Sequence, residues 1–282
     1  IEAAKAAGIP ENGDYNGVTQ EGVGVYQSNI GRGYRKGSAQ AYLKDALKNS
    51  KIDLRTNAVA TGLIFDNHGV SGVHYSSDKG ATVQSVFASK QVVLCCGAIN
   101  TPRLMIVSGL GDPEHLRDIG APLRHDLKGV GQNLRDHYTT RFTSRVSGAQ
   151  TINGIANSKP KLLWEGVKWL SGAPSILGMG VVLAGAFCKS SPELDRPDLV
   201  ITFTPGSFKE GFLGVLDNIP GMTTGVWPLR PKSSGYVKAA SCNIFEAPII
   251  QPNYFSDPHD KDLLLKGQKL IRGILSKPPI KR

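Results

Sequence analysis

The feature that most constrains the fold is the segment VVLCCGAINTPRLMIVSGLG, residues 92–111. An apolar run over residues 91–96 is typical of a strand buried on both faces. It ends at Gly97-Ala98, and apolar residues then recur with helical spacing. A buried strand that turns through glycine into a helix is how α/β folds place a ligand at the carboxyl end of a sheet. The segment therefore predicts a strand, a ligand-contacting turn and a helix.

The adjacent cysteines Cys95 and Cys96 raise the question of a metal or redox site. Neighbouring side chains on a strand point to opposite faces, so the two thiols cannot ligate one metal. A disulfide between adjacent residues departs from normal disulfide geometry. Cys188 and Cys242 complete the set without a Cys-x-x-Cys pair or a zinc spacing. We expect two small buried hydrophobic side chains, no metal site and a reduced environment.

Helices are indicated where apolar spacing meets terminal signals. Asn100 and Pro102 suit the first turn of a helix that ends at Gly109, as N-cap and early proline. A serine N-cap at Ser38 begins an amphipathic pattern that closes near Asn49. Further elements are expected as helices at 113–119, 160–170 and from Asp260 towards Leu275, and as strands at 52–55, 58–65, 70–75, 83–88, 139–146 and 199–203.

Charge and composition restrict the class of protein. The net charge is +10, but Lys and Arg are scattered among Asp and Glu, with no run of five or six basic residues. This favours a solvated surface over a nucleic-acid interface. No apolar run is long enough to span a membrane. We expect a cytoplasmic protein, and peripheral membrane association of the parent protein stays open.

Generic catalytic motifs are missing from the sequence. None of the paired glycines at 22–24, 109–111 and 129–131 completes Gly-x-Gly-x-x-Gly after a strand. No P-loop, Gly-x-Ser-x-Gly or His-Glu-x-x-His is present. His137 lies in a polar, Gly-flanked loop with Asn133 and Asp136. Either the imidazole acts as a base or hydrogen-bond donor, or the loop is held together by its own side chains, which is the reading we favour.

Several segments together resemble one family. Residues 97–111 match its second signature, with small residues at 97 and 98, Thr101-Pro102, Leu104-Met105, Ser108-Gly109 and Gly111. Four other stretches, one before and three after this signature, are arranged in the family's order. They are Asp14–Gly17 with Gly22–Tyr26 and Arg35–Ser38, Gly129–His137, Arg230–Val237 and Pro252–Phe255. The chain thereby resembles the glucose–methanol–choline (GMC) family of flavin oxidoreductases.

The resemblance implies an FAD-dependent enzyme that oxidises an alcohol by hydride transfer to the flavin. It implies α/β plus α+β architecture, with a partial, Rossmann-like FAD-binding domain at 1–138 and a partial sheet-and-helix substrate domain at 139–282. By position, the cofactor-binding residues are Val59, Gly97, Ala98, Asn133, Asp136 and His137. No catalytic residue is expected within the chain, because the family's active-site histidine lies beyond Arg282.

Departures from the family pattern qualify this expectation. The family's N-terminal Gly-x-Gly-x-x-Gly is missing, so the chain resembles the middle half of such an enzyme and is expected to be inactive alone. A non-catalytic scaffold without flavin is the alternative. Where choline-oxidising members carry an acid before Ala184-Gly185, this chain has Leu183, which argues for a neutral alcohol over choline. The electron acceptor is unknown.

Overall fold

The computed structural model describes residues 1–49, 51–212 and 214–281, which form two compact units. Unit 1 comprises Ile1–Ile52, His137–Pro231 and Pro258–Arg282, and unit 2 comprises Asp53–Asp136 and Lys232–Asp257. The sequence predicts one boundary near residue 138, whereas the chain passes between the two units at four places. Which unit serves which function stays a proposal.

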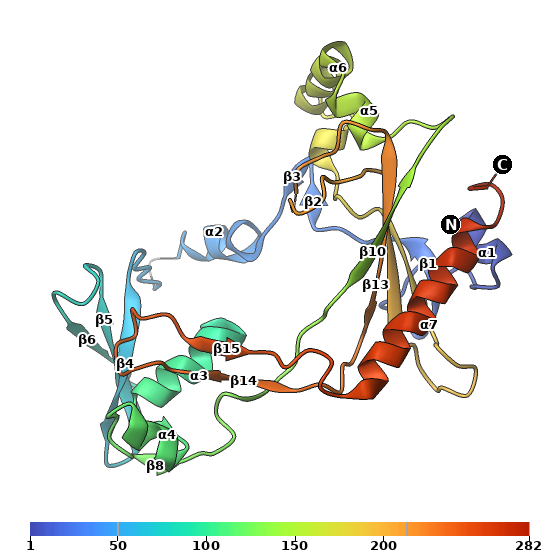
Figure 1. Cartoon of the computed structure of the whole chain (residues 1–282). Helices are drawn as coiled ribbons and strands as arrows, with labels where there is room; N and C mark the ends of the chain where they lie inside the picture. The colour runs from blue at the N-terminus through green and yellow to red at the C-terminus, as the bar shows by residue number, and fades with distance from the viewer. Residues whose placement is uncertain (50, 213, 282) are drawn as a thin grey trace. The chain divides into compact units, whose positions relative to one another are not determined.

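Unit 1 is built on a five-stranded antiparallel sheet of order β1-β11-β12-β13-β10 (Figure 1). A two-stranded sheet, β2-β3, and several short helices complete the unit. Its elements are α1 (Glu2–Ala6), β1 (Gly22–Val25), β2 (Ile30–Gly31), β3 (Tyr34–Arg35), a π-helix (Ala39–Leu43), α2 (Lys44–Ala46), β10 (Thr140–Arg145), α5 (Ile152–Ala156), α6 (Lys159–Leu170), a 3-10 helix (Ile176–Gly178), β11 (Ala184–Cys188), β12 (Leu199–Thr204), β13 (Gly221–Pro228) and α7 (Pro258–Leu275).

The core of unit 1 lies between this sheet and α7, which runs along one face of it (Figure 1). The helix buries Leu263, Leu264, Ile271 and Ile274, spaced so that they share one side. They pack against buried apolar residues of β1, β11, β12 and β13, namely Val23, Ala186, Cys188, Leu199, Ile201 and Val226. Strand β12 is buried along nearly its whole length, instead of alternating between buried and exposed residues as antiparallel strands commonly do.

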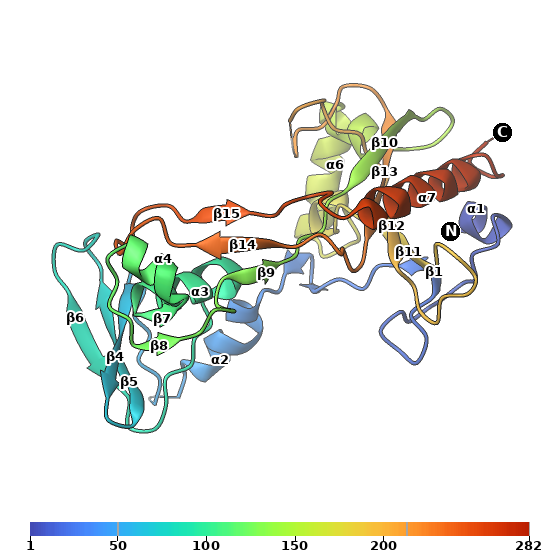
Figure 2. The same ribbon diagram turned by 60° about the horizontal axis from the view of Figure 1, so that its bottom comes forward.

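Unit 2 combines small sheets with two helices. Its sheets are β4-β5-β6, β15-β14-β9 and the parallel pair β7-β8. Figure 2 shows β9, β14 and β15 side by side, with α3 next to them. The elements are β4 (Val59–Asp66), β5 (Gly69–Ser76), β6 (Gln84–Phe87), α3 (Gly97–Val107), β7 (Leu110–Gly111), α4 (Pro113–Asp118), β8 (His125–Asp126), β9 (Gln132–Leu134), β14 (Gly235–Lys238) and β15 (Ile249–Gln251).

Most predicted elements are present within one or two residues, and the mixed α/β fold class is confirmed. The exceptions are the strands predicted at 52–55 and 91–96, which do not form. A strand is stable only beside a partner, and among the described residues no strand pairs with either run. Cys95 and Cys96 are consequently exposed free thiols, so the prediction that they are buried is wrong.

Two predicted helix caps are also wrong. The helix α3 begins at Gly97, four residues earlier than expected from an N-cap at Asn100, so Asn100 lies inside the helix and Pro102 in its second turn. Ser38 has φ −54° and ψ −36°, which are helical values, and its side chain makes no capping hydrogen bond. An N-cap needs extended backbone geometry to reach the following N–H groups. Gly109, with φ +90°, ends α3 as predicted.

Two glycines of α7 provide a test of how tightly the helix packs on the sheet. A Cβ at Gly267 would lie 2.6 Å from Cγ2 of Val226, whereas a Cβ at Gly273 would meet nothing within 4 Å. We expect Gly267→Ala to lower the free energy of unfolding by about 1–2 kcal/mol, because overpacking outweighs the gain in helix propensity. The control Gly273→Ala should raise it by up to about 1 kcal/mol. Urea unfolding measures both, and equal effects would contradict this packing.

Candidate functional site

The N-terminus of α3 is the first component of the candidate site. Gly97 has φ +81°, a value that glycine adopts without strain. The preceding Cys96 provides no side-chain cap, so the first N–H groups of α3 are not satisfied by a capping side chain. Such groups, together with the helix dipole, favour an anionic ligand at this end.

A cavity of about 430 Å³ adjoins this end of the helix. It is bounded on one side by Ala98 and Pro102 of α3 and on the other by the β9 loop and β14. The residues that these elements contribute are Gly131, Gln132, Asn133, Leu134, Arg135 and Val237. Two predicted site residues, Ala98 and Asn133, therefore lie on one cavity although 35 positions separate them in the sequence.

The second wall of the cavity depends on a close backbone approach. Gly131 has φ +78°, and a Cβ there would lie 2.1 Å from the carbonyl oxygen of Val237. The N–H of Val237 donates to the carbonyl of Gly131 at 2.7 Å. Asn133, with φ +61°, then turns the chain, and Leu134 pairs with Gly235 of β14. The loop geometry therefore requires glycine at position 131.

The polar residues of this loop bind distant segments. The phenol of Tyr254 donates to Oδ2 of Asp136, and this hydrogen bond raises the pKa of Tyr254. In unit 1, Nε2 of His137 lies 3.0 Å from the carbonyl oxygen of Leu229 and, as the donor, carries the proton. These two contacts join the loop to residues about a hundred positions away, so the loop is not held only by its own side chains.

Val59 lies apart from this cavity, as the first residue of β4. A buried serine links its strand to α3. Oγ of Ser108 accepts the N–H of Leu63 at 2.9 Å and donates to the carbonyl of Leu104 at 2.6 Å. Ser108 therefore fixes the position of β4, which carries Val59, relative to α3, which carries Ala98.

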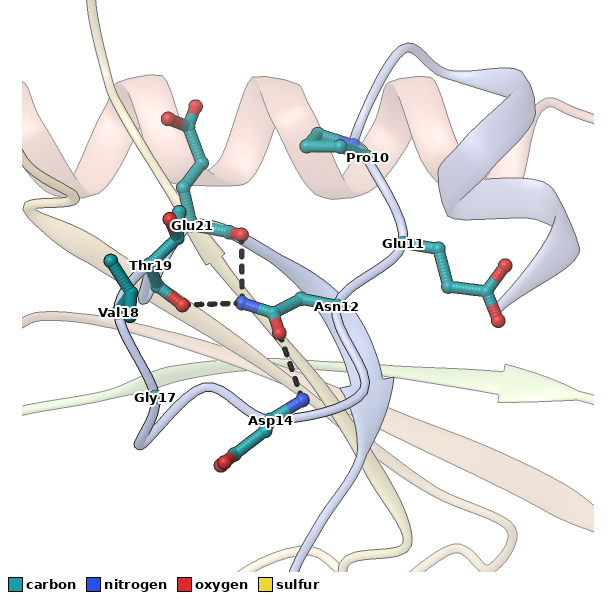
Figure 3. Close-up of a pocket in the computed structure, with 8 residues that line it drawn as sticks. All are labelled: Pro10, Glu11, Asn12, Asp14, Gly17, Val18, Thr19 and Glu21. Carbon is teal, nitrogen blue, oxygen red and sulfur yellow. Dashed lines mark hydrogen bonds between the residues drawn. The ribbon is translucent and has the colours of Figure 1, made fainter.

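A second hollow lies in unit 1 within the segment Pro10–Glu21 (Figure 3). Asn12 organises it, since its Nδ2 donates to the carbonyls of Thr19 at 2.7 Å and Glu21 at 3.0 Å. A Cβ at Gly24 would lie 2.1 Å from the carbonyl oxygen of Asn12. The glycines at 22–24 therefore serve this local loop. The described residues contain no cluster of three metal-ligating side chains.

Comparison with known proteins identifies the family. The family described as "GMC oxidoreductase" matches residues 1–139. An alcohol dehydrogenase [acceptor] from Pseudomonas putida is 35% identical over 278 residues, which cover 99% of this chain and 50% of the relative. An oxygen-dependent choline dehydrogenase from Staphylococcus xylosus is 32% identical over 276 residues, which cover 98% of this chain and 48% of the relative. The chain belongs to the GMC oxidoreductase family.

Solved structures share the fold of this GMC chain. An FAD-dependent oxidoreductase from Chaetomium thermophilum superposes with a TM-score of 0.89 at 19% identity, over 99% of this chain and 54% of that chain. A formate oxidase gives a TM-score of 0.86 at 24% identity, over 97% and 52%. The chain thus spans about half the length of the relatives that it matches.

Sequence reasoning missed three residues that shape the candidate GMC site. Val237 borders the cavity, Ser108 joins α3 to β4, and Arg103 of α3 donates to the carbonyls of Ile244 and Glu246. Burial lowers the pKa of Arg103. The only sequence signal for these three residues is that Arg103 interrupts an apolar helical pattern, because the partners of all three are set by tertiary contacts.

Gly131 and Gly129 provide a matched pair of variants in the loop formed by residues 129–137. Gly131→Ala should lower the free energy of unfolding by about 2–4 kcal/mol, because it combines backbone strain with a clash against Val237. Gly129 has no positive φ and open space around it, so Gly129→Ala should change stability by less than about 1 kcal/mol. Denaturant unfolding followed by circular dichroism measures both. Similar losses in the two variants would contradict the close approach.

Ser108→Ala tests the link between α3 and β4. The variant leaves the buried N–H of Leu63 without its acceptor and should cost about 1–3 kcal/mol. Ser171→Ala is the control, because that exposed hydroxyl bonds only within its own helix end. Amide hydrogen exchange at Leu63 should rise in Ser108→Ala alone. Unchanged protection at Leu63 would contradict the assigned role.

Proposed function

We propose that this chain is part of an FAD-dependent oxidoreductase that oxidises the CH–OH group of a neutral alcohol. FAD is the cofactor that the GMC family and the FAD-dependent structural neighbour support. The observation that carries the proposal is the cavity in which Ala98 of α3 and Asn133 of the β9 loop lie together. Its two walls come from the two segments whose motifs resemble the family most closely.

The residues present fit the nucleotide half of such a cofactor. Ala98 has a small side chain beside the cavity, and the uncapped N-terminus of α3 suits a negatively charged group. Strand β4 is at the edge of its sheet in the described structure, so backbone groups of Val59 that face away from β5 are open to a planar ligand. Gly97, Asn133, Asp136 and His137 support these walls rather than acting in chemistry.

When bound, FAD supplies the acceptor for the hydride that leaves the carbinol carbon. In this proposal the residues of unit 2 orient the cofactor, and unit 1 contributes to the substrate side. No residue of this chain is assigned to proton removal, because the resemblance places that histidine beyond Arg282. The electron acceptor is not assigned.

Leu183 favours a neutral alcohol over choline. Its backbone is fixed beside β11, where its N–H donates to the carbonyl of Phe203 at 3.1 Å and its carbonyl accepts the N–H of Tyr26 at 2.9 Å. A half-buried leucine there offers no charge to a quaternary ammonium group. The relatives include both an alcohol dehydrogenase and choline dehydrogenases, so this position discriminates between two substrates found among them.

All four cysteines are free, which supports the expected cytoplasmic location.

The test uses the full-length product of the gene that encodes this chain. The purified protein should show the visible absorption of oxidised flavin, and anaerobic addition of a primary alcohol should bleach it. Choline at equal concentration should bleach it at least about tenfold more slowly. A folded, colourless protein would contradict the function and favour a non-catalytic scaffold, and equal reaction with choline would contradict the substrate assignment alone.

Leu183→Glu tests the substrate assignment within the same enzyme. A carboxylate at this position should raise kcat/KM for choline relative to a neutral alcohol by on the order of tenfold. Leu183→Gln is the matched control, because it has the same shape without the charge. Steady-state kinetics measures the ratio, and the same ratio in both variants would contradict the proposed location of Leu183 near the substrate.

A further inference from the structure

Helix α6 carries its apolar side chains on the outside of unit 1. Leu163, Trp164, Val167 and Leu170 have exposed fractions of 72%, 62%, 47% and 79%. At 100° per residue, these four positions fall on one side of the helix. We call these four residues the α6 apolar face. Figure 1 shows α6 clear of the sheet and of α7 in unit 1.

The opposite side of α6 faces the protein and carries Glu165 and Trp169, whose ring packs against Tyr34. The side chain of Glu165 is 8% exposed, pairs with Lys168 and accepts the N–H of Ile176 at 2.9 Å. The ion pair with Lys168, followed by the Ile176 hydrogen bond, lowers the pKa of Glu165. Ser175 donates to the backbone carbonyl of Glu165 at 2.9 Å. An ordinary surface helix presents charged and polar residues to solvent on its outer side, so the α6 apolar face requires a partner.

The charges around this face indicate which partner. Lys159 and Lys161 are exposed at the start of α6, and Lys168 lies near its end. The single acid of the helix is the buried Glu165, so the exposed surface combines leucine, tryptophan and lysine without a carboxylate. Lysines attract anionic lipid headgroups, and tryptophan is enriched at the membrane interface.

We propose that α6 docks unit 1 on an anionic lipid bilayer, with its axis in the plane of the interface and the α6 apolar face inserted. Leu163 and Leu170 would enter the boundary between headgroups and acyl chains, and the flanking lysines would contact the headgroups. The helix has 12 residues, and no described helix is long and apolar enough to cross a membrane, so it would lie on the surface. The chain's net charge of +10 acts in the same direction. The inference goes beyond the proposed function and does not depend on bound flavin.

Sedimentation of the full chain with lipid vesicles tests the proposal. Vesicles of phosphatidylcholine with phosphatidylglycerol should bind the protein, and pure phosphatidylcholine should bind it at least about tenfold more weakly. The triple variant Leu163→Ser, Val167→Ser, Leu170→Ser should lose at least about tenfold in partitioning. Lys159→Gln with Lys161→Gln should lose on the order of tenfold on anionic vesicles only.

Control substitutions are available on the exposed side of α7. Leu265→Ser matches the apolar change, and Lys261→Gln with Lys266→Gln matches the charge change. These variants should partition like the unchanged chain. Trp164 provides a direct readout, since brominated lipid should quench its fluorescence and Trp164→Phe should abolish that component.

Three results would overturn the proposal. The first is no preference for anionic vesicles, and the second is equal loss of partitioning in the controls. The third is a triple variant that keeps its lipid binding but changes the sedimentation coefficient, which would assign the α6 apolar face to a second copy of the chain. Should the triple variant unfold, absence of Trp164 quenching in the unchanged chain would overturn the proposal by itself.

Discussion

The candidate site depends on a backbone contact between two segments about a hundred residues apart. The carbonyl oxygen of Val237 occupies the place where a Cβ of residue 131 would lie, and the N–H of Val237 donates back to Gly131. This contact draws β9 against β14 and turns Asn133 towards the cavity that Ala98 borders. Arg103 of α3 donates to the carbonyls of Ile244 and Glu246, and it thereby holds the segment between β14 and β15 against α3. Without glycine at position 131, β9 and β14 could not approach closely enough to form the second wall of the cavity.

Two helices of unit 1 show opposite solutions to the same physical problem. In α7, Leu263 and Ile271 face the sheet and the lysines face solvent, so the helix is stabilised by the core that it covers. In α6, Glu165 is turned inward and satisfied by Lys168 and Ile176, and the leucines face outward. The free-energy cost of exposing that face is removed only by an apolar partner. The surrounding lysines are positively charged, so an anionic bilayer is the partner of complementary charge.

Local patterns predicted most of the elements because their signals are short-range. The helices predicted at 113–119 and from Asp260 towards Leu275, and the strands predicted at 58–65 and 70–75, each depend on neighbours in the sequence. The predicted strand at 91–96 failed for the opposite reason. An apolar run indicates that a strand would be stable between partners, and pairing decides whether it forms. The exposure of Cys95 and Cys96 follows from that missing pairing.

The sequence by itself determined the family, because the residues of the 97–111 signature and the 129–137 loop are constrained one by one. It also determined that Leu183, and no acid, occupies its position beside β11. Only the tertiary structure decided that Ala98 and Asn133 share a cavity, that Asp136 is held by Tyr254, and that α6 faces outward with its leucines. Contacts between residues a hundred positions apart leave no periodic trace in a single sequence, since either partner could be satisfied by many other groups.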